Sequence, residues 1–294
     1  MRAGELVVLS GRHKSFKSTH VLQMGRDGAA GQAFLGRFTV PKPVLVLIVQ
    51  EEIHPTFYAL RVQEMVADLD RHSRSRMLVL NRRGVRLEKD TAPWDGLIAL
   101  IGERRPQILI LDNVSAMFPP GIRENDYQEV YTRVIAPLLE LRDKYDLGII
   151  AVAHDRKPVG DSGRSVRGTS AWENAADTLI VIHRSEALAT IKVEARNGGG
   201  AEDYAVRFNP ETGQLELAEL PPRITTPERA STINAMLASG GSISAPDLAK
   251  ALNIARNAAL LRLQALVGEG HVTVDASQRP HVFSLKEEAR EATE

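Results

Sequence analysis

The feature that most constrains the fold is a series of short apolar runs, separated by longer amphipathic segments, over the first 183 residues. Each run is apolar at nearly every position, which is typical of strands buried on both faces of a parallel sheet. The predicted strands are 5–10, 44–50, 76–80, 107–112, 148–153 and 178–183. Apolar residues recur at helical spacing between them, in 18–24, 56–69, 94–101 and 127–145. This alternation predicts a doubly wound α/β domain, whose ligands bind at the carboxyl ends of the strands.

The pattern changes after residue 183, and we divide the chain accordingly. Short segments at 188–195, 203–208 and 214–218 predict antiparallel strands added to the same sheet. Pro221-Pro222 marks a break, so we expect one domain at 1–220, a second at 221–288 and a frayed tail at 289–294. The elements expected in the second domain are helices 227–238, 244–252 and 255–268 and strands 271–274 and 281–285, with a Gly-Gly-Ser turn after the first helix.

Composition excludes several classes of protein. Of the 294 residues, 43% are hydrophobic and 25% charged, as in ordinary soluble globular proteins. Lys plus Arg equals Asp plus Glu at 37 each, so nucleic-acid binding would depend on a local patch. There is no cysteine, which excludes disulfide scaffolds, thiolate zinc sites and thiol nucleophiles. The longest apolar stretch, around 44–49, is far shorter than the roughly 20 residues of a membrane span. We therefore expect a soluble, cytoplasmic protein without a membrane partner.

A candidate phosphate-binding loop follows the first predicted strand. The pattern G-x-x-x-x-G-K-[ST] is met by Gly11, Lys17 and Ser18, while Phe16 stands where the second glycine belongs. Backbone N–H groups at a helix N-terminus would hold phosphate, Lys17 would bridge the β- and γ-phosphates, and the Ser18 hydroxyl would bind Mg²⁺. The alternative is a basic strand–helix turn without nucleotide. The candidate residues are Gly11, Lys14, Ser15, Phe16, Lys17, Ser18 and Thr19, with ATP and Mg²⁺ as cofactors.

Acidic residues end two of the predicted strands. Asp112 closes the run QILILD, and Glu51 and Glu52 follow VLIVQ. Because the carboxyl ends of parallel strands meet at one edge, these acids are expected near the loop. Asp112 could hold Mg²⁺ through water, and one glutamate could deprotonate the attacking water. A strand-terminal acid taken alone is as often only a helix N-cap.

The whole series of motifs resembles the RecA-like ATPases of the RepA hexameric helicase group, which are related more distantly to DnaB-type replicative helicases. It covers about residues 4–218 and comprises KSFKST, QEE, ILILD, IIAVAHDRK, RGTSAWENAADTLIVI and VEARNGGG. Members of that group often carry K-[ST]-F-K-[ST], so Phe16 agrees with them. The resemblance implies that Asp112 is the metal-side acid and Glu51 the catalytic glutamate. Glu52 remains the alternative within the pair, and we favour Glu51.

Two further features gain a role from the resemblance. His154 follows the strand at 148–153, where RecA-like folds place a polar sensor of the γ-phosphate; a histidine at a strand end can also be purely structural. The segment 155–169 resembles the central DNA-binding loop of the helicases, and we expect it to be mobile and to follow the phosphates of single-stranded DNA. An ordinary solvated loop is the alternative. Its basic residues are Arg156, Lys157, Arg164 and Arg167.

Arg196 occupies the arginine-finger position of the K-x-R-N-G strand of ring helicases. The family lysine two residues earlier is Glu194 here, and Lys192 is displaced from it by two residues, which on a strand keeps the same face. A finger of this kind reaches the γ-phosphate bound by a neighbouring subunit. The resemblance therefore implies a ring or filament of identical chains, with a hexamer expected.

The segment 225–285 resembles a winged helix, with Arg256 and Arg262 on its third helix as candidate DNA-binding residues. This segment contains five basic and four acidic residues, whereas duplex readers usually carry a clear basic excess. DNA contact and docking of a partner protein therefore both remain open.

The leading expectation is an ATP-driven ring motor on single-stranded DNA, a replicative DNA helicase of RepA type. One alternative is a RecA-like recombination mediator, in which ATP switches a filament bound to DNA. Another is a winged-helix regulator whose ATPase core acts as a slow switch. The expected partners are single-stranded DNA, further copies of the chain, and replication or recombination proteins.

Overall fold

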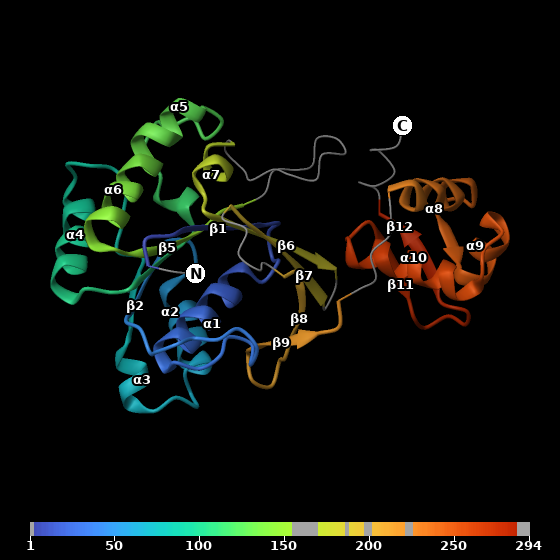
Figure 1. The fold of residues 1–294 in the computed structure, drawn as a ribbon, viewed down its shortest axis with the longest axis horizontal. Helices are drawn as coiled ribbons and strands as arrows, with labels where there is room; N and C mark the ends of the chain where they lie inside the picture. Colours follow the sequence, from blue (N-terminus) through green and yellow to red (C-terminus); the bar gives the residue numbers. More distant parts are fainter. Residues whose placement is uncertain (1–2, 155–169, 186–187, 197–201, 221–225, 287–294) are drawn as a thin grey trace.

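The computed structural model describes residues 3–154, 170–185, 188–196, 202–220 and 226–286. Within these residues nine strands form one sheet in the order β3-β2-β4-β5-β1-β6-β7-β8-β9 (Figure 1). The strands are β1 (Leu6–Gly11), β2 (Val46–Gln50), β3 (Met77–Asn81), β4 (Ile108–Asp112), β5 (Gly148–Val152), β6 (Thr178–Ser185), β7 (Leu188–Ala195), β8 (Tyr204–Phe208) and β9 (Leu215–Ala218). The strands from β3 to β6 are parallel, and β7, β8 and β9 continue the sheet antiparallel. The predicted α/β class and antiparallel extension are confirmed.

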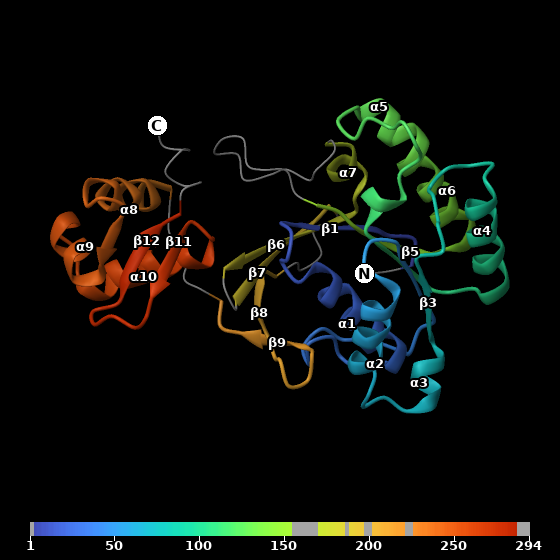
Figure 2. The ribbon, with the colours of Figure 1, turned by 180° about the vertical axis from the view of Figure 1, so that it is seen from behind.

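Helices cover both faces of the parallel part of the sheet (Figures 1 and 2). One face carries α1 (Lys17–Ala30), α2 (Pro55–Met65) and α3 (Arg71–Ser75). The other carries α4 (Ala92–Arg104), α5 (Tyr127–Val130), α6 (Ala136–Tyr145) and α7 (Ser170–Ala175). A 3₁₀ turn, η1 (Val114–Met117), follows β4, and a π-helical turn, η2 (Tyr131–Ile135), joins α5 to α6. None of these helices, in the part of the chain described, is both long and apolar enough to cross a membrane.

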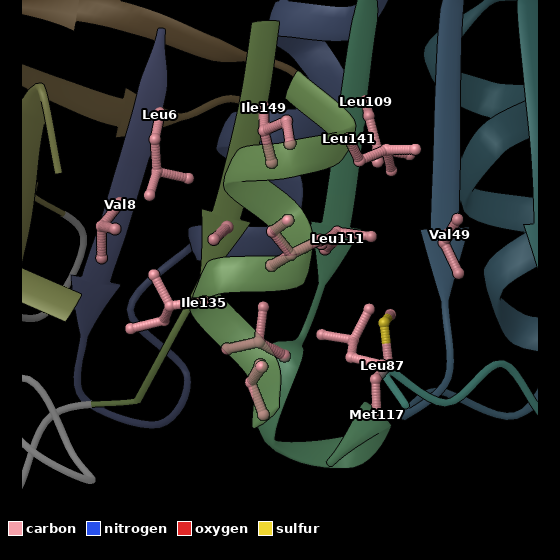
Figure 3. Packing of buried hydrophobic residues seen from close by; sticks show 14 of the residues in the cluster. Leu6, Val8, Val49, Leu87, Leu109, Leu111, Met117, Ile135, Leu141 and Ile149 are labelled. Atoms are coloured by element: carbon pink, nitrogen blue, oxygen red, sulfur yellow. The ribbon is translucent and has the colours of Figure 1, made fainter. Parts of the chain in front are cut away.

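The apolar runs fill two cores because successive side chains of a strand point to opposite faces. In β1, Leu6 and Val8 belong to the core under α4 and α6, whereas Val7 and Leu9 belong to the core under α1 and α2. Figure 3 shows the first core, where Leu6 and Val8 of β1, Ile149 of β5, and Leu109 and Leu111 of β4 lie in one cluster with Ile135 and Leu141. Burial on both faces explains why the runs contain almost no polar residue.

A second, three-stranded sheet lies in the C-terminal part of the chain and has its own hydrophobic cluster. Its elements are α8 (Thr226–Ala238), β10 (Ser242–Ser244), α9 (Ala245–Leu252), α10 (Arg256–Gly268), β11 (Val272–Asp275) and β12 (Val282–Leu285). The three predicted helices and two predicted strands are present. The turn expected at the Gly-Gly-Ser sequence is present at Gly240 and Gly241, and its serine begins β10, an additional strand that pairs with β12. The Thr190 hydroxyl of β7 donates a hydrogen bond of 3.3 Å to the carbonyl of Gly268, where α10 ends.

Candidate active site

A cleft of about 540 Å³ lies where the parallel strands β1, β2, β4 and β5 end. Six of the seven predicted nucleotide-binding residues line it, and Gly11 ends the strand that leads into them. A Cβ at Gly11 would lie 2.7 Å from both the Ile182 carbonyl oxygen and Ser15 Oγ, so only glycine fits there. The lining residues are His13, Lys14, Ser15, Phe16, Lys17, Ser18, Thr19, Glu52, Ile53, Arg61, Glu64, Asp112, Asn113, His154, Arg184, Phe208 and Gly213.

The loop is closed around the Lys17 side chain at the first turn of α1. Lys17 Nζ donates to the carbonyl oxygens of Gly11, at 2.6 Å, and of Arg12, at 2.7 Å. The side chain is buried, so its ammonium group lies beneath the loop rather than in solvent. This charge adds to the backbone N–H groups and the dipole at the start of α1, and together they favour an anion in the cleft.

Phe16 replaces the second glycine of the general loop pattern, and its backbone shows why glycine is usual there. Phe16 has φ +70° and ψ 11°, in the left-handed region that an L residue with a side chain adopts at a cost. Its ring stacks on Phe208, with centroids 5.7 Å apart and 16° between the planes, and the Arg184 guanidinium lies 4.0 Å from the ring centroid. Arg184 also donates to the Lys14 carbonyl at 2.7 Å. These contacts hold the loop in a conformation that phenylalanine by itself disfavours.

Ser18 and Asp112 form the part of the cleft suited to Mg²⁺. Burial raises the pKa of Asp112 to about 6, and the nearby Ser18 hydroxyl opposes this effect. Asp112 Oδ2 is buried without a hydrogen-bond partner among the described residues, so one anionic oxygen remains for a ligand. Carboxylate and hydroxyl oxygens are hard ligands of the type that Mg²⁺ prefers, and this ion commonly binds one or two protein ligands together with water and substrate phosphates. No group of three acidic or histidine side chains able to hold a metal occurs among the described residues.

The adjacent glutamates Glu51 and Glu52 face different surroundings, and Glu51, which we favoured as the catalytic glutamate, is not among the residues that line the cleft. The Glu51 carboxylate accepts the backbone N–H groups of Arg83, Gly84 and Val85, at 3.0, 3.1 and 3.1 Å. Three N–H groups of the loop after β3 thus bind the Glu51 carboxylate. Of the two adjacent glutamates, Glu52 is the one that lines the cleft with the phosphate loop.

His154 and Asn113 complete the polar wall around Glu52. Asn113 Nδ2 lies 2.5 Å from Glu52 Oε2 and 2.9 Å from His154 Nε2. Glu52 Oε2 and His154 Nε2 are 3.7 Å apart. The neighbouring His154 imidazole lowers the pKa of Glu52 below its ordinary value, burial opposes this effect, and the Asn113 amide adds to it. Glu52 is therefore a carboxylate at neutral pH.

Arg196 lies beside the N-terminal ends of the parallel strands, whereas the cleft of its own chain lies at their C-terminal ends. β7 runs antiparallel to β6, so the C-terminal end of β7 pairs with the start of β6, at Thr178. The backbone N–H of Arg196 donates to the Asp177 carbonyl at 2.9 Å, and its guanidinium donates to the carbonyl of Asn174. Lys192, Glu194 and Arg196 are all exposed, as expected for residues on one face of a strand.

The predicted DNA-binding residues lie in two parts of the chain, one of which the structure does not describe. Arg156, Lys157, Arg164 and Arg167 lie outside the described residues. Arg256 is exposed at the start of α10. Arg262, which we expected to face DNA, donates to the Glu228 carboxylate at 2.9 Å, because α8 presents this acid to α10. The Arg262 guanidinium therefore joins two helices of the same unit.

Several residues of the cleft lining were not predicted from the sequence, among them Arg61, Asn113, Arg184 and Phe208. Asn113 follows the strand-end Asp112 directly, so its position in the chain was a usable signal. Arg184 stands at the end of β6, a parallel strand of the same sheet, and could have been proposed on the same ground. Arg61 and Phe208 reach the cleft from α2 and β8, and neither has a local signal in the sequence.

Comparison with solved structures finds the same fold in two ATPase structures. The chain aligns with a structure whose title names an ATPase domain, at a TM-score of 0.54 and 11% identity, covering 74% of this chain and 86% of that one. It aligns with "The Structure Of A DnaB-Like Replicative Helicase And Its Interactions With Primase" at a TM-score of 0.53 and 12% identity, covering 74% of this chain and 58% of that one. These likenesses show a RecA-like core with a phosphate loop.

A comparison of the sequence with curated proteins returned no match. The AAA domain family (AAA_25), in contrast, matches residues 1–160, which include the phosphate loop, both glutamates, Asp112 and His154. The chain therefore belongs to the AAA domain family, and its core is a RecA-like ATPase domain.

Proposed function

We propose that this protein is an ATP-hydrolysing ring motor that acts on single-stranded DNA, a replicative DNA helicase of the RepA type. The observation that carries the proposal is the cleft itself, where a lysine–serine loop, a buried aspartate, a glutamate and a histidine meet at the ends of four strands. This set contains each group that hydrolysis of a nucleoside triphosphate needs from one subunit. The titles of the two similar structures name an ATPase domain and a helicase, which supports the same class.

In this proposal the triphosphate lies against the start of α1. Lys17 would exchange the carbonyl oxygens of Gly11 and Arg12 for oxygens of the β- and γ-phosphates, a small movement for a flexible side chain. Ser18 and Asp112 would hold Mg²⁺, which supplies positive charge to the phosphate oxygens when it is bound. The left-handed backbone at Phe16 would turn the N–H groups of the loop toward the phosphates.

Glu52 would act as the general base, in place of the favoured Glu51. An ionised carboxylate can accept the proton of the attacking water, and the lowered pKa of Glu52 keeps it ionised at neutral pH. His154 borders the same space and would contact the γ-phosphate as a sensor. Glu51 would stabilise the loop after β3 through its three backbone hydrogen bonds.

Assembly and DNA binding complete the proposal. Because Arg196 lies across the sheet from its own cleft, it could act as a finger only in a neighbouring subunit, which requires a ring such as a hexamer. Arg156, Lys157, Arg164 and Arg167 would contact DNA phosphates. We further propose an ATPase domain at 1–220 and a winged-helix domain at 221–288, which would bind DNA through Arg256 or dock a replication protein.

Unwinding of a tailed duplex, with particle images in the presence of an ATP analogue, tests this function. We expect closed rings and ATP-dependent strand separation. Open filaments on DNA without unwinding would favour a recombination mediator, and ATP hydrolysis with neither rings nor unwinding would favour a regulator. Either of these results would contradict the helicase proposal.

A further inference from the structure

We propose that Asn113 is a positioning residue, whose single amide group holds both the proposed base Glu52 and the proposed sensor His154. The inference rests on the proposed ATPase function for its kinetic consequence, but its structural content can be measured separately. Asn113 directly follows Asp112, the last residue of β4, so two consecutive residues would serve the metal side and the base side of the cleft.

The orientation of the Asn113 amide follows from its hydrogen bonds. Asn113 Oδ1 accepts the backbone N–H of Ala116 at 3.0 Å, as the cap of η1. Its Nδ2 therefore faces Glu52 Oε2 and His154 Nε2. The flipped amide would place its oxygen against the Glu52 carboxylate and its NH₂ group against a backbone N–H, which are two repulsive contacts. Each of the two amide hydrogens then has an acceptor of its own.

This orientation also selects the tautomer of His154. An amide nitrogen only donates, so His154 Nε2 must accept, and a neutral imidazole that accepts at Nε2 has its proton on Nδ1. A protonated His154 would instead direct an N–H toward Asn113. Nε2 lies 2.9 Å from the amide nitrogen, within hydrogen-bond distance, and 3.7 Å from the Glu52 carboxylate, beyond that distance.

The bridge has a direct consequence for catalysis. Glu52 and His154 lie at the ends of different strands, β2 and β5, and β4 with Asn113 lies between these strands in the sheet. One donor group between them fixes the direction of the carboxylate and leaves its second oxygen free for water. It also transmits a displacement of His154 to Glu52, as expected if a sensor and a base respond to the same phosphate.

A purely structural role is the competing explanation, because Asn113 also caps η1. The variant Asn113→Asp distinguishes the positioning role from the capping role. An aspartate keeps an oxygen for the Ala116 N–H, and aspartate is a good cap, but it has no hydrogen to donate to Glu52 or His154. The control is Asn209→Asp, at a residue that is not part of the cleft lining. The Asn209 side chain likewise accepts a backbone N–H, that of Glu211 at 2.9 Å, and donates to a carboxylate, that of Glu216 at 2.6 Å.

Nuclear magnetic resonance of ¹⁵N-histidine-labelled full-length protein tests the bridge without reference to activity. His154 is assigned by its loss in His154→Gln. We expect the Nδ1–H tautomer in the wild type and in Asn209→Asp, and a change to Nε2–H or to the imidazolium in Asn113→Asp. An Nε2–H tautomer in the wild type, or an unchanged tautomer in Asn113→Asp, would overturn the proposal.

Steady-state ATP hydrolysis tests the kinetic consequence. Asn113→Asp should lower kcat by about 10–100-fold, within the roughly 10²–10⁴-fold contribution of a general base, with KM for ATP within about threefold of wild type and an unchanged Tm. Asn209→Asp should keep wild-type kcat. Wild-type turnover in Asn113→Asp would refute the positioning role. If the wild type itself hydrolyses no ATP, the proposed function fails, while the tautomer result still decides the bridge.

Discussion

The carboxylates of Glu51 and Glu52 belong to adjacent residues but are bound to different parts of the chain. Glu51 accepts the N–H of Val85, 34 residues further along, at 3.1 Å, whereas Glu52 accepts from Asn113, 61 residues along, at 2.5 Å. One acid therefore supports a loop, and the other faces the phosphate loop across the cleft. This relationship makes the two glutamates separable by experiment.

Replacing each glutamate by glutamine should produce different defects. Glu52→Gln should keep ATP binding and lose about 10²–10⁴-fold in kcat, because the base is removed while the ground state is spared. Glu51→Gln should turn over ATP near the wild-type rate and lose roughly 1 kcal/mol of unfolding free energy, since charge-assisted hydrogen bonds to the loop after β3 are weakened. Single-turnover kinetics and urea unfolding of both variants measure this. The reverse pattern would return the base to Glu51.

Much of the fold could be predicted because its information is local. The residues of β4 before Asp112 are all apolar, so the strand and the acid at its end are visible in the sequence. β10 could not be predicted, because Ser242–Ser244 has no apolar run and forms a strand only by pairing with β12, about 40 residues away. The different surroundings of Glu51 and Glu52 could not be predicted for the same reason, since the loop after β3 binds the Glu51 carboxylate.

Phe16 offers a test of the strained phosphate loop. Phe16→Gly and Phe16→Ala both lose the contacts with Phe208 and Arg184, but only glycine relieves the strain at φ +70°. We expect the glycine variant to be more stable than the alanine variant by about 1 kcal/mol. Parallel urea titrations compare the two. Equal stabilities, or a more stable alanine variant, would show that the loop does not carry this strain.

His20 should make stability fall as the solution is acidified. It is fully buried in α1, its Nε2 lies 2.9 Å from the Tyr204 hydroxyl, and burial lowers the pKa of His20 to about 3 from 6.5. Between these values the unfolded chain binds a proton that the folded chain does not, so His20 lowers stability by about 1.4 kcal/mol per pH unit as the pH falls below 6.5.

The matched variant for this prediction is His20→Gln, which keeps a hydrogen-bonding group but does not titrate. Urea unfolding of both proteins at several pH values between about 7.5 and 5 should give a steeper pH dependence for the wild type. Parallel curves for the two proteins would mean that His20 is solvated or protonated in the folded state.

Arg196 should act on the site of a neighbour. Because its guanidinium lies at the opposite edge of the sheet from its own cleft, Arg196→Ala should leave nucleotide binding intact and lower turnover by about 10³–10⁵-fold. An excess of this variant mixed with wild type should depress activity below simple dilution. Lys192→Ala, on the same exposed face of β7, should have a smaller effect. If the activity of the mixtures is simply proportional to the fraction of wild-type chains, a site shared between subunits is refuted.

The central claim is that this cleft hydrolyses ATP in an assembly that responds to single-stranded DNA. The most direct measurement is ATP turnover of wild type and Lys17→Ala, with and without single-stranded DNA, with the mass of the assembly determined in the same samples. We expect the wild type to form a ring-sized oligomer whose turnover rises with DNA, and Lys17→Ala to be folded and inactive, because Lys17 lies beneath the phosphate loop. Wild-type turnover in Lys17→Ala, or a monomer whose activity ignores DNA, would contradict the account.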